Sequence, residues 1–187
     1  GILGWLKGDP EAVFVAEFEA ATIAGLKEKI SAFSSAAHKA GIGEGFAALY
    51  DPKEKEHVWQ VRKAGLGLLL SKRSYSRAIA FIEDLSIPPE RLSPFMKCFS
   101  AYLKKMGKEA GIYGHIGSGC MHIRPYIDLR DKSENLLMKQ IMEEVSTMVK
   151  DHGGAMSGEH GDGLIRTWLN EKMFGRELYE AFRQLKN

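Results

Sequence analysis

Residues 111–128 read GIYGHIGSGCMHIRPYID, and this stretch decides how the rest of the chain can fold. It is apolar at both ends with a glycine-rich centre, which is typical of two strands joined by a tight turn. With Ser118 and Gly119 as the two central turn residues, His115 lies opposite His122. Directly opposed residues share one face of a sheet, with their Cβ atoms about 5 Å apart. The stretch therefore predicts a β-hairpin that places two imidazoles side by side, either around one metal ion or as hydrogen-bonded core histidines.

Helices and short strands alternate on either side of this hairpin. The helices are predicted from apolar residues at helical spacing and from proline, capping residues and glycine at their ends. The strands are predicted from short apolar runs. The predicted helices cover residues 22–39, 52–70, 88–106 and 133–150, a helical tail covers 168–186, and the predicted strands cover 12–18, 45–50 and 78–82. This order predicts an α+β fold, with helices packed on one face of a mostly antiparallel sheet.

Composition narrows the class of protein. The 187 residues suit one domain or two small ones, and no apolar run approaches the roughly 20 residues that cross a bilayer. The net charge of +2 is uneven, because residues 53–108 carry 12 positive and 5 negative side chains. This excess is either a solvated face or an attraction for an anionic small molecule or a cofactor phosphate.

Several classes of site are not supported by the sequence. The near-neutral charge, without interleaved aromatic and basic residues, predicts no nucleic-acid partner. No G-x-G-x-x-G follows a predicted strand, so a Rossmann nucleotide site is not expected. Cys98 and Cys120 are the only cysteines, and we expect no disulfide between them, as in a reducing compartment.

A second glycine-rich motif, SGEHGDG at residues 157–163, follows the hairpin. Neighbouring side chains on a turn point to different sides, so Glu159 can ligate a metal while His160 faces a substrate. Imidazole is a natural general base at neutral pH. The alternative is a capping glutamate beside an exposed loop histidine. Two histidines and a carboxylate suit Zn, Mn or Fe, so the two motifs together predict a site for a divalent metal.

Two further residues are candidates for binding. Arg62 ends the sequence WQVR on the basic predicted helix, and a guanidinium can hold a carboxylate through two parallel hydrogen bonds. The alternative for Arg62 is an ordinary surface arginine. Cys120 is either a soft metal ligand or, as we expect, a small buried side chain.

Together these motifs resemble one known family. GHIGSGCMH at 114–122 resembles the G-H-x-G-x-G-x-x-H signature of the FAD-linked oxidase C-terminal domain, SGEHGDG resembles its S-G-E-H-G-x-G, and WQVR resembles its W-x-x-R. The resemblance covers nearly the whole chain. It implies the ferredoxin-like cap, or substrate-binding, domain of a flavoenzyme of the vanillyl-alcohol-oxidase type. Such enzymes oxidise D-2-hydroxy acids, namely D-lactate, D-2-hydroxyglutarate or glycolate, and a separate domain holds the FAD.

The resemblance also implies roles for individual residues. By motif position, the metal ligands would be His115, His122 and Glu159. His160 would take the hydroxyl proton while C2 passes hydride to flavin N5, and Arg62 would hold the substrate carboxylate.

The chain departs from the common pattern of this family at Cys120 and Arg124, where many members have asparagine. The CMHIRP version resembles long bacterial members that fuse the flavin unit to an iron–sulfur module, so such a module is a further expected partner. Arg124 either contacts a second substrate carboxylate, which would favour a dicarboxylate such as D-2-hydroxyglutarate, or faces solvent. No role is assigned to Lys72, Arg73 or Arg77.

We therefore expect residues 1–187 to be one substrate-binding domain of a larger flavoprotein, inactive without its FAD-binding domain. The expected location is cytoplasmic, with peripheral attachment to the inner face of the membrane as a second option for the full-length protein. Two other classes stay open. One is a stand-alone metal-dependent hydrolase or metal-binding module that uses His115, His122 and Glu159, and the other is an interaction domain that has lost the chemistry.

Overall fold

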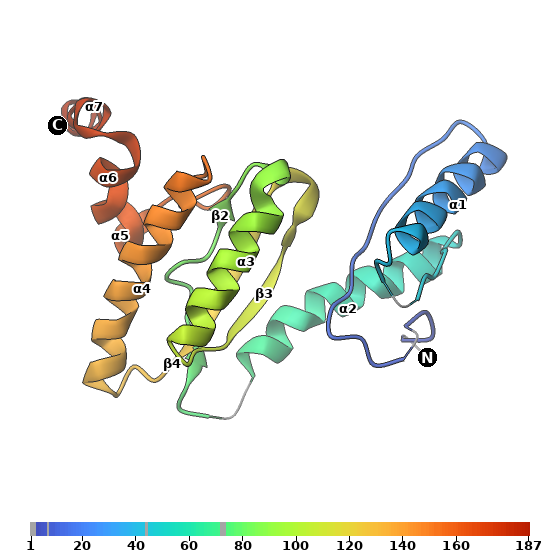
Figure 1. Cartoon of the computed structure of the whole chain (residues 1–187), viewed down its shortest axis with the longest axis horizontal. Coiled ribbons are helices and arrows are strands. Elements are labelled where there is room, and N and C mark those ends of the chain that lie inside the picture. Colours follow the sequence, from blue (N-terminus) through green and yellow to red (C-terminus); the bar gives the residue numbers. More distant parts are fainter. Residues whose placement is uncertain (1–2, 7, 44, 72–73) are drawn as a thin grey trace. The chain divides into compact units, whose positions relative to one another are not determined.

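The computed structural model describes residues 3–6, 8–43, 45–71 and 74–187 (Figure 1). The chain divides into two compact units, Gly1–Leu68 and Leu69–Asn187. Within the described residues, no helix is both long enough and apolar enough to span a bilayer.

The second unit contains an antiparallel sheet built around one central strand, β4 (Cys120–Ile127). Strand β3 (Ala110–His115) pairs along one side of β4. Because that side is taken, β1 (Arg77–Ala78) and β2 (Leu85–Ser86) share the other side, pairing with opposite ends of β4. Ile79 still donates its backbone N–H to the Pro125 carbonyl of β4 at 3.0 Å, and residues 80–84 then form no strand before β2.

The order of elements in this unit is ferredoxin-like. After β2 come α3 (Pro89–Lys105), the hairpin β3–β4 and α4 (Lys132–Asp151), and the chain then returns to the sheet at Ala155, which bridges to Ser86. Counted from β2, this is the β-α-β-β-α-β order of a ferredoxin-like domain. The bridge at Ala155 takes the place of the last strand, beside β2. The predicted α+β class is therefore confirmed.

Helices α3 and α4 pack side by side against one face of the sheet (Figure 1). Helix α3 starts with proline, which suits the first turn, and Asp131 caps α4 by accepting from the Ser133 N–H at 2.8 Å. The apolar faces of both helices repeat at helical spacing, as predicted. The core between them and the sheet includes Leu92, Phe95, Phe99 and Leu103 from α3, Ile141, Val145 and Val149 from α4, and Met121, Ile123 and Ile127 from β4.

The C-terminal tail is helical, as predicted, but interrupted. It consists of α5 (Gly163–Arg166), a 3₁₀ turn, α6 (Asn170–Phe174) and α7 (Arg176–Lys186). Gly175, at φ 83°, separates the last two helices, because a left-handed backbone cannot continue a right-handed helix.

The first unit contains two of the predicted helices, α1 (Ile23–Lys39) and all but the last two residues of α2 (Pro52–Leu70). Thr22 caps α1, accepting from the Gly25 N–H at 3.1 Å. The strands predicted over 12–18 and 45–50 are wrong: both segments lack ladder pairing, and Phe14 is 77% exposed. A strand needs a partner, and none pairs with either segment within the described part of this unit. Their apolar side chains instead help to line an open cavity of about 920 Å³.

The strand predicted over 78–82 is also wrong for most of its length. Only Arg77–Ala78 pairs with β4, although Phe81 and Ile82 are fully buried. Residues 80–84 make no ladder pairs, and Asp84, with its left-handed φ of 74°, lies directly before β2. The apolar run is therefore explained by burial in the core and not by strand pairing.

The hairpin is confirmed, but its register differs from the prediction. A 3₁₀ turn (Ile116–Ser118) followed by Gly119 at φ 72° replaces the two-residue turn, so that His115 pairs with Cys120 and Tyr113 with His122. The register is shifted by two residues. Because side chains alternate between faces, an even shift keeps His115 and His122 on the same face.

Alanine in place of Gly119 is expected to lower the free energy of unfolding by about 3 kcal/mol. The left-handed backbone disfavours a Cβ atom, and this one would lie 1.7 Å from the carbonyl oxygen of Ile87. The matched control is Gly107→Ala, because Gly107 also has a positive φ, of 64°, but open space around its Cβ position. That change should cost about 1 kcal/mol. Equal losses for both variants in urea unfolding would contradict the role of the close approach to Ile87.

Candidate active site

The face of β4 turned away from the helices carries polar side chains. Cys120, His122 and Arg124 alternate with Met121 and Ile123, which belong to the core. His122 is nevertheless buried, at 3% exposure, because other side chains cover it.

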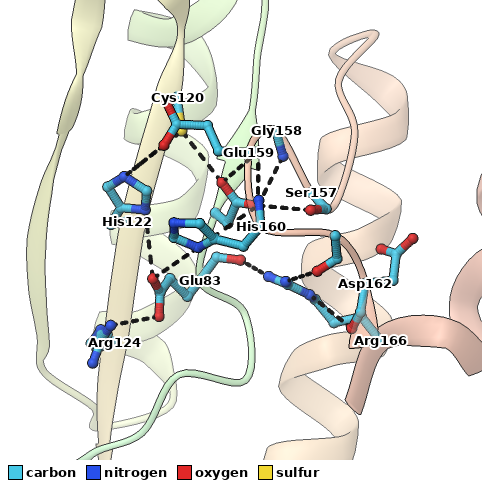
Figure 2. Close-up of polar contacts among 12 residues, drawn as sticks. Glu83, Cys120, His122, Arg124, Ser157, Gly158, Glu159, His160, Asp162 and Arg166 are labelled. Carbon is cyan, nitrogen blue, oxygen red and sulfur yellow. Dashed lines mark hydrogen bonds and ion pairs between the residues drawn. The ribbon is translucent and has the colours of Figure 1, made fainter. Parts of the chain in front are cut away.

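The loop after α4 brings the second motif over this face, and Figure 2 shows His122, Glu159 and His160 pointing toward one another. The rings of His122 and His160 stack with centroids 5.2 Å apart, and His115 meets His122 edge-on at 5.6 Å. His122 Nε2 lies 3.7 Å from Glu159 Oε2. The structure thus brings His115, His122 and Glu159 together, with His160 beside them.

These residues fit a metal ion by their geometry and chemistry. One ligand atom from each of His115, His122 and Glu159 lies within 4.8 Å of the other two. Bound to one ion at about 2.0–2.2 Å each, such atoms would lie up to about 4 Å apart, so small rotations complete the site. Burial lowers the pKa of His122, against the opposing effect of Glu83, and this favours the neutral imidazole that a metal requires.

A buried glutamate that the sequence analysis missed lies at the centre of the site. Glu83 is 6% exposed, and its carboxylate lies 2.8 Å from Arg124 Nη2, 3.3 Å from His160 Nδ1 and 3.7 Å from His122 Nδ1 (Figure 2). At 3.7 Å the contact with His122 is longer than a hydrogen bond, and His122 Nδ1 has no hydrogen-bond partner among the described residues, so Glu83 acts on this ring through its charge. The available signal was the pair of carboxylates in the apolar run AIAFIEDLSI, because buried charges need partners.

Arg124 is not a solvent-facing arginine, so that alternative is wrong. Its side chain is only 15% exposed and is held by Glu83. Its Nε is buried without a hydrogen-bond partner in the described structure. The terminal N–H groups that do not contact Glu83 are therefore the part of the Arg124 guanidinium that a ligand could use.

The neighbouring carboxylate, Asp84, was also missed. It is fully buried and accepts hydrogen bonds from the Ser157 hydroxyl at 2.7 Å and from the backbone N–H of His160 at 2.8 Å. Burial raises the pKa of Asp84, but the hydrogen bonds from His160 and Ser157 outweigh it, and the pKa is lowered to about 2. Asp84 is therefore ionised at any ordinary pH.

Cys120 is a small buried side chain, as expected. Its Sγ donates to Asp84 Oδ1 at 3.5 Å. Burial, with Asp84 beside it, raises the pKa of the Cys120 thiol to about 12. In this state the Cys120 thiol keeps its proton and serves as a hydrogen-bond donor to Asp84.

Arg62 belongs to α2 in the first unit, where its guanidinium lies 5.7 Å from the ring centroid of Trp59. The site above belongs to the second unit, and the substrate contact expected for Arg62 stays a prediction. Arg77 forms part of β1, whereas Lys72 and Arg73 lie outside the described residues.

The chain is similar in sequence to one family model and to several curated proteins. Residues 2–187 match the family model of the C-terminal domain of FAD-linked oxidases. Curated relatives named D-2-hydroxyglutarate dehydrogenase include those of Escherichia coli (35% identity over 96% of this chain), Haemophilus influenzae (36% over 76%) and Pseudomonas putida (38% over 69%). The aligned part of the chain spans only 17%, 14% and 13% of the length of these three relatives.

Proposed function

Because the chain belongs to the family of FAD-linked oxidase C-terminal domains, we propose that it is the substrate- and metal-binding cap of an FAD-dependent dehydrogenase. The reaction is the oxidation of a D-2-hydroxy acid to the 2-oxo acid. One observation carries the proposal: ligand atoms of His115, His122 and Glu159, from two distant motifs, gather within 4.8 Å of one another.

The proposed metal ligands are His115, His122 and Glu159, and the ion is Zn, Mn or Fe. Two ring nitrogens and a carboxylate oxygen suit all three, and they leave coordination positions open for a substrate. A cation held by these residues would supply polarisation of the substrate hydroxyl, and FAD, held mainly by another domain, would supply the hydride acceptor.

His160 is the proposed general base that takes the hydroxyl proton. Its Nδ1 lies 3.3 Å from Glu83, so a hydrogen on Nδ1 directed at that carboxylate leaves the lone pair of Nε2 for the substrate. Arg62 is proposed to hold the carboxylate next to the reacting carbon, as a guanidinium fork can.

The proposed substrate is a dicarboxylate of the D-2-hydroxyglutarate type, with D-lactate as the smaller alternative. The names of the relatives at 35–38% identity support this choice. Arg124 supports it as well, because the terminal N–H groups of its guanidinium that Glu83 does not use can face a second carboxylate.

We also propose that the cap works against the FAD-binding domain of the same full-length polypeptide. The residues directly after the second motif support such a contact, since Leu164 is fully exposed and Ile165 and Trp168 are 43% and 45% exposed. An iron–sulfur module as a further partner, and a cytoplasmic or membrane-peripheral location, belong to the same proposal.

The full-length flavoprotein should reduce a dye in the presence of D-2-hydroxyglutarate, and a chelator should slow this turnover at least about tenfold. Added Zn²⁺ or Mn²⁺ should restore it. The 187-residue chain alone should turn over none of these acids. Absence of flavin absorbance in the full-length protein would overturn the proposal, and chelator-sensitive hydrolysis by the chain alone would indicate a metal-dependent hydrolase instead.

A further inference from the structure

The loop that carries Glu159 and His160 is wrapped around the carboxylate of Asp84. The backbone N–H groups of Gly158, Glu159 and His160 all donate to Asp84 Oδ2, at 3.1, 3.1 and 2.8 Å, and the Glu159 N–H also approaches Oδ1 at 3.0 Å. The Ser157 hydroxyl donates to Oδ2 at 2.7 Å. Successive N–H groups around one anion form a nest, the arrangement that many proteins use to hold phosphate. Here the anion belongs to the chain itself.

The backbone of Asp84 is set for this contact. Among the described residues other than glycine, Asp84 alone has a positive φ, 74°, and it has no exposed surface. Its carbonyl oxygen also accepts from the Gly158 N–H at 2.8 Å. A left-handed conformation in a non-glycine residue is unfavourable and persists only where the surroundings hold it in place.

Asp84 is not available as a metal ligand. Its Oδ2 already accepts from four donors, and its Oδ1 accepts from the Glu159 N–H and the Cys120 thiol. A ligating carboxylate needs a free lone pair directed at the ion. The carboxylate therefore binds the loop backbone, although Asp84 lies within reach of His122 and His160.

The side chains of Glu159 and His160 depend on this backbone. They are 46% and 50% exposed, and apart from the ring contact of His160 with His122 and the charge of Glu83, little packs around them. The loop after His160 is held by Arg166, which donates to the carbonyl of Gly161 in the loop and to the carbonyl of Glu83. This contact lies after Glu159 and His160 in the chain. Ser157 to His160 have their main anchor at Asp84.

We propose that Asp84 is a positioning residue, whose carboxylate fixes the backbone of Ser157 to His160 and thereby places Glu159 and His160 over His122. The hydrogen bonds from Ser157, Gly158, Glu159 and His160 to the Asp84 carboxylate, called the clamp below, are a property of the fold. The meaning of the clamp for metal binding rests on the proposed function, and the experiment keeps the two apart.

The test uses the 187-residue chain and the variant Asp84→Asn, which keeps the size of the side chain and removes its charge. Amide hydrogen exchange at Gly158, Glu159 and His160 should become about 10- to 100-fold faster, because hydrogen bonds to a charged acceptor are lost. Amides of β3 and β4 should keep their rates. Zn²⁺ affinity, measured by calorimetry, should fall about 10- to 100-fold, as it does when a metal site loses its outer support.

Two further variants provide controls. Asp128→Asn removes a carboxylate that accepts from the backbone N–H of Arg130, away from the loop, and should leave loop exchange and Zn²⁺ affinity unchanged. Ser157→Ala removes one of the donors and should leave the three amides protected.

Unchanged amide exchange in Asp84→Asn would overturn the inference, and so would faster exchange with unchanged Zn²⁺ affinity. Loss of protection in Ser157→Ala alone would also overturn it, since the hydroxyl would then be the anchor. If Asp84→Asn does not fold, couplings across the hydrogen bonds from the three amide nitrogens to the Asp84 carboxyl carbon decide: their presence in the unsubstituted chain supports the clamp, and their absence overturns it. If the unsubstituted chain binds no Zn²⁺, the metal assignment fails, and amide exchange together with the ring contact of His122 and His160 decides the clamp.

Discussion

Replacing His160 by glutamine is expected to lower kcat for oxidation of a D-2-hydroxy acid by about 10²–10⁴-fold, the usual contribution of a general base. His160 is half-exposed, stacks on His122 and has its Nδ1 3.3 Å from Glu83, which leaves Nε2 as the nitrogen proposed to face a substrate. Glutamine keeps a polar side chain on the loop but cannot take up a proton. The measurement is steady-state dye reduction by the full-length flavoprotein with saturating metal.

KM should change much less than kcat in this variant, because proton transfer belongs to the transition state. The matched control is His38→Gln, which changes an exposed histidine of α1 outside the site and should leave kcat unchanged. A full kcat in His160→Gln would remove the base assignment and leave the metal ligands untouched.

Replacing Glu83 by leucine is expected to lower the free energy of unfolding by about 3–5 kcal/mol. The change leaves the guanidinium of Arg124, 15% exposed, without the carboxylate that lies 2.8 Å from it. It also removes the acceptor near His122 and His160. An uncompensated buried charge is among the few causes of so large an effect from one substitution.

A double-mutant cycle isolates this pair. Arg124→Met combined with Glu83→Leu should recover most of the lost stability, because no unpaired charge remains. The control is Arg130→Met, which breaks the ion pair with Asp128, where the Arg130 side chain is 59% exposed; this should cost within about 1 kcal/mol. Purely additive losses for Glu83 and Arg124 in urea unfolding would contradict the proposed coupling.

The helices could be predicted from the sequence because their signals are local. Thr22, Pro52, Pro89 and Asp131 lie at or next to the helix starts, and apolar residues repeat on one face. The conformation of residues 12–18 and 45–50 could not be predicted in this way, because a strand depends on a partner far away in the sequence. The same holds for Glu83 and Asp84, since their partners lie in β4 and in the loop at 157–160.

The convergence of His115 and His122 was predicted from an incorrect register. It held because alternation of side chains requires only that the error be an even number of residues. The apolar residues Met121 and Ile123 set the face of β4, and that part of the pattern was visible in the sequence.

The turn between β3 and β4 carries a parity constraint. The core contacts of Met121 and Ile123 fix which face of the sheet Cys120, His122 and Arg124 occupy. Losing or gaining one residue within 116–119 would therefore turn His115 to the helix side of the sheet. Losing or gaining two would slide it along the same face. Natural length variation in this turn should therefore come in steps of two, and an odd step should be accompanied by a bulge that restores the original side.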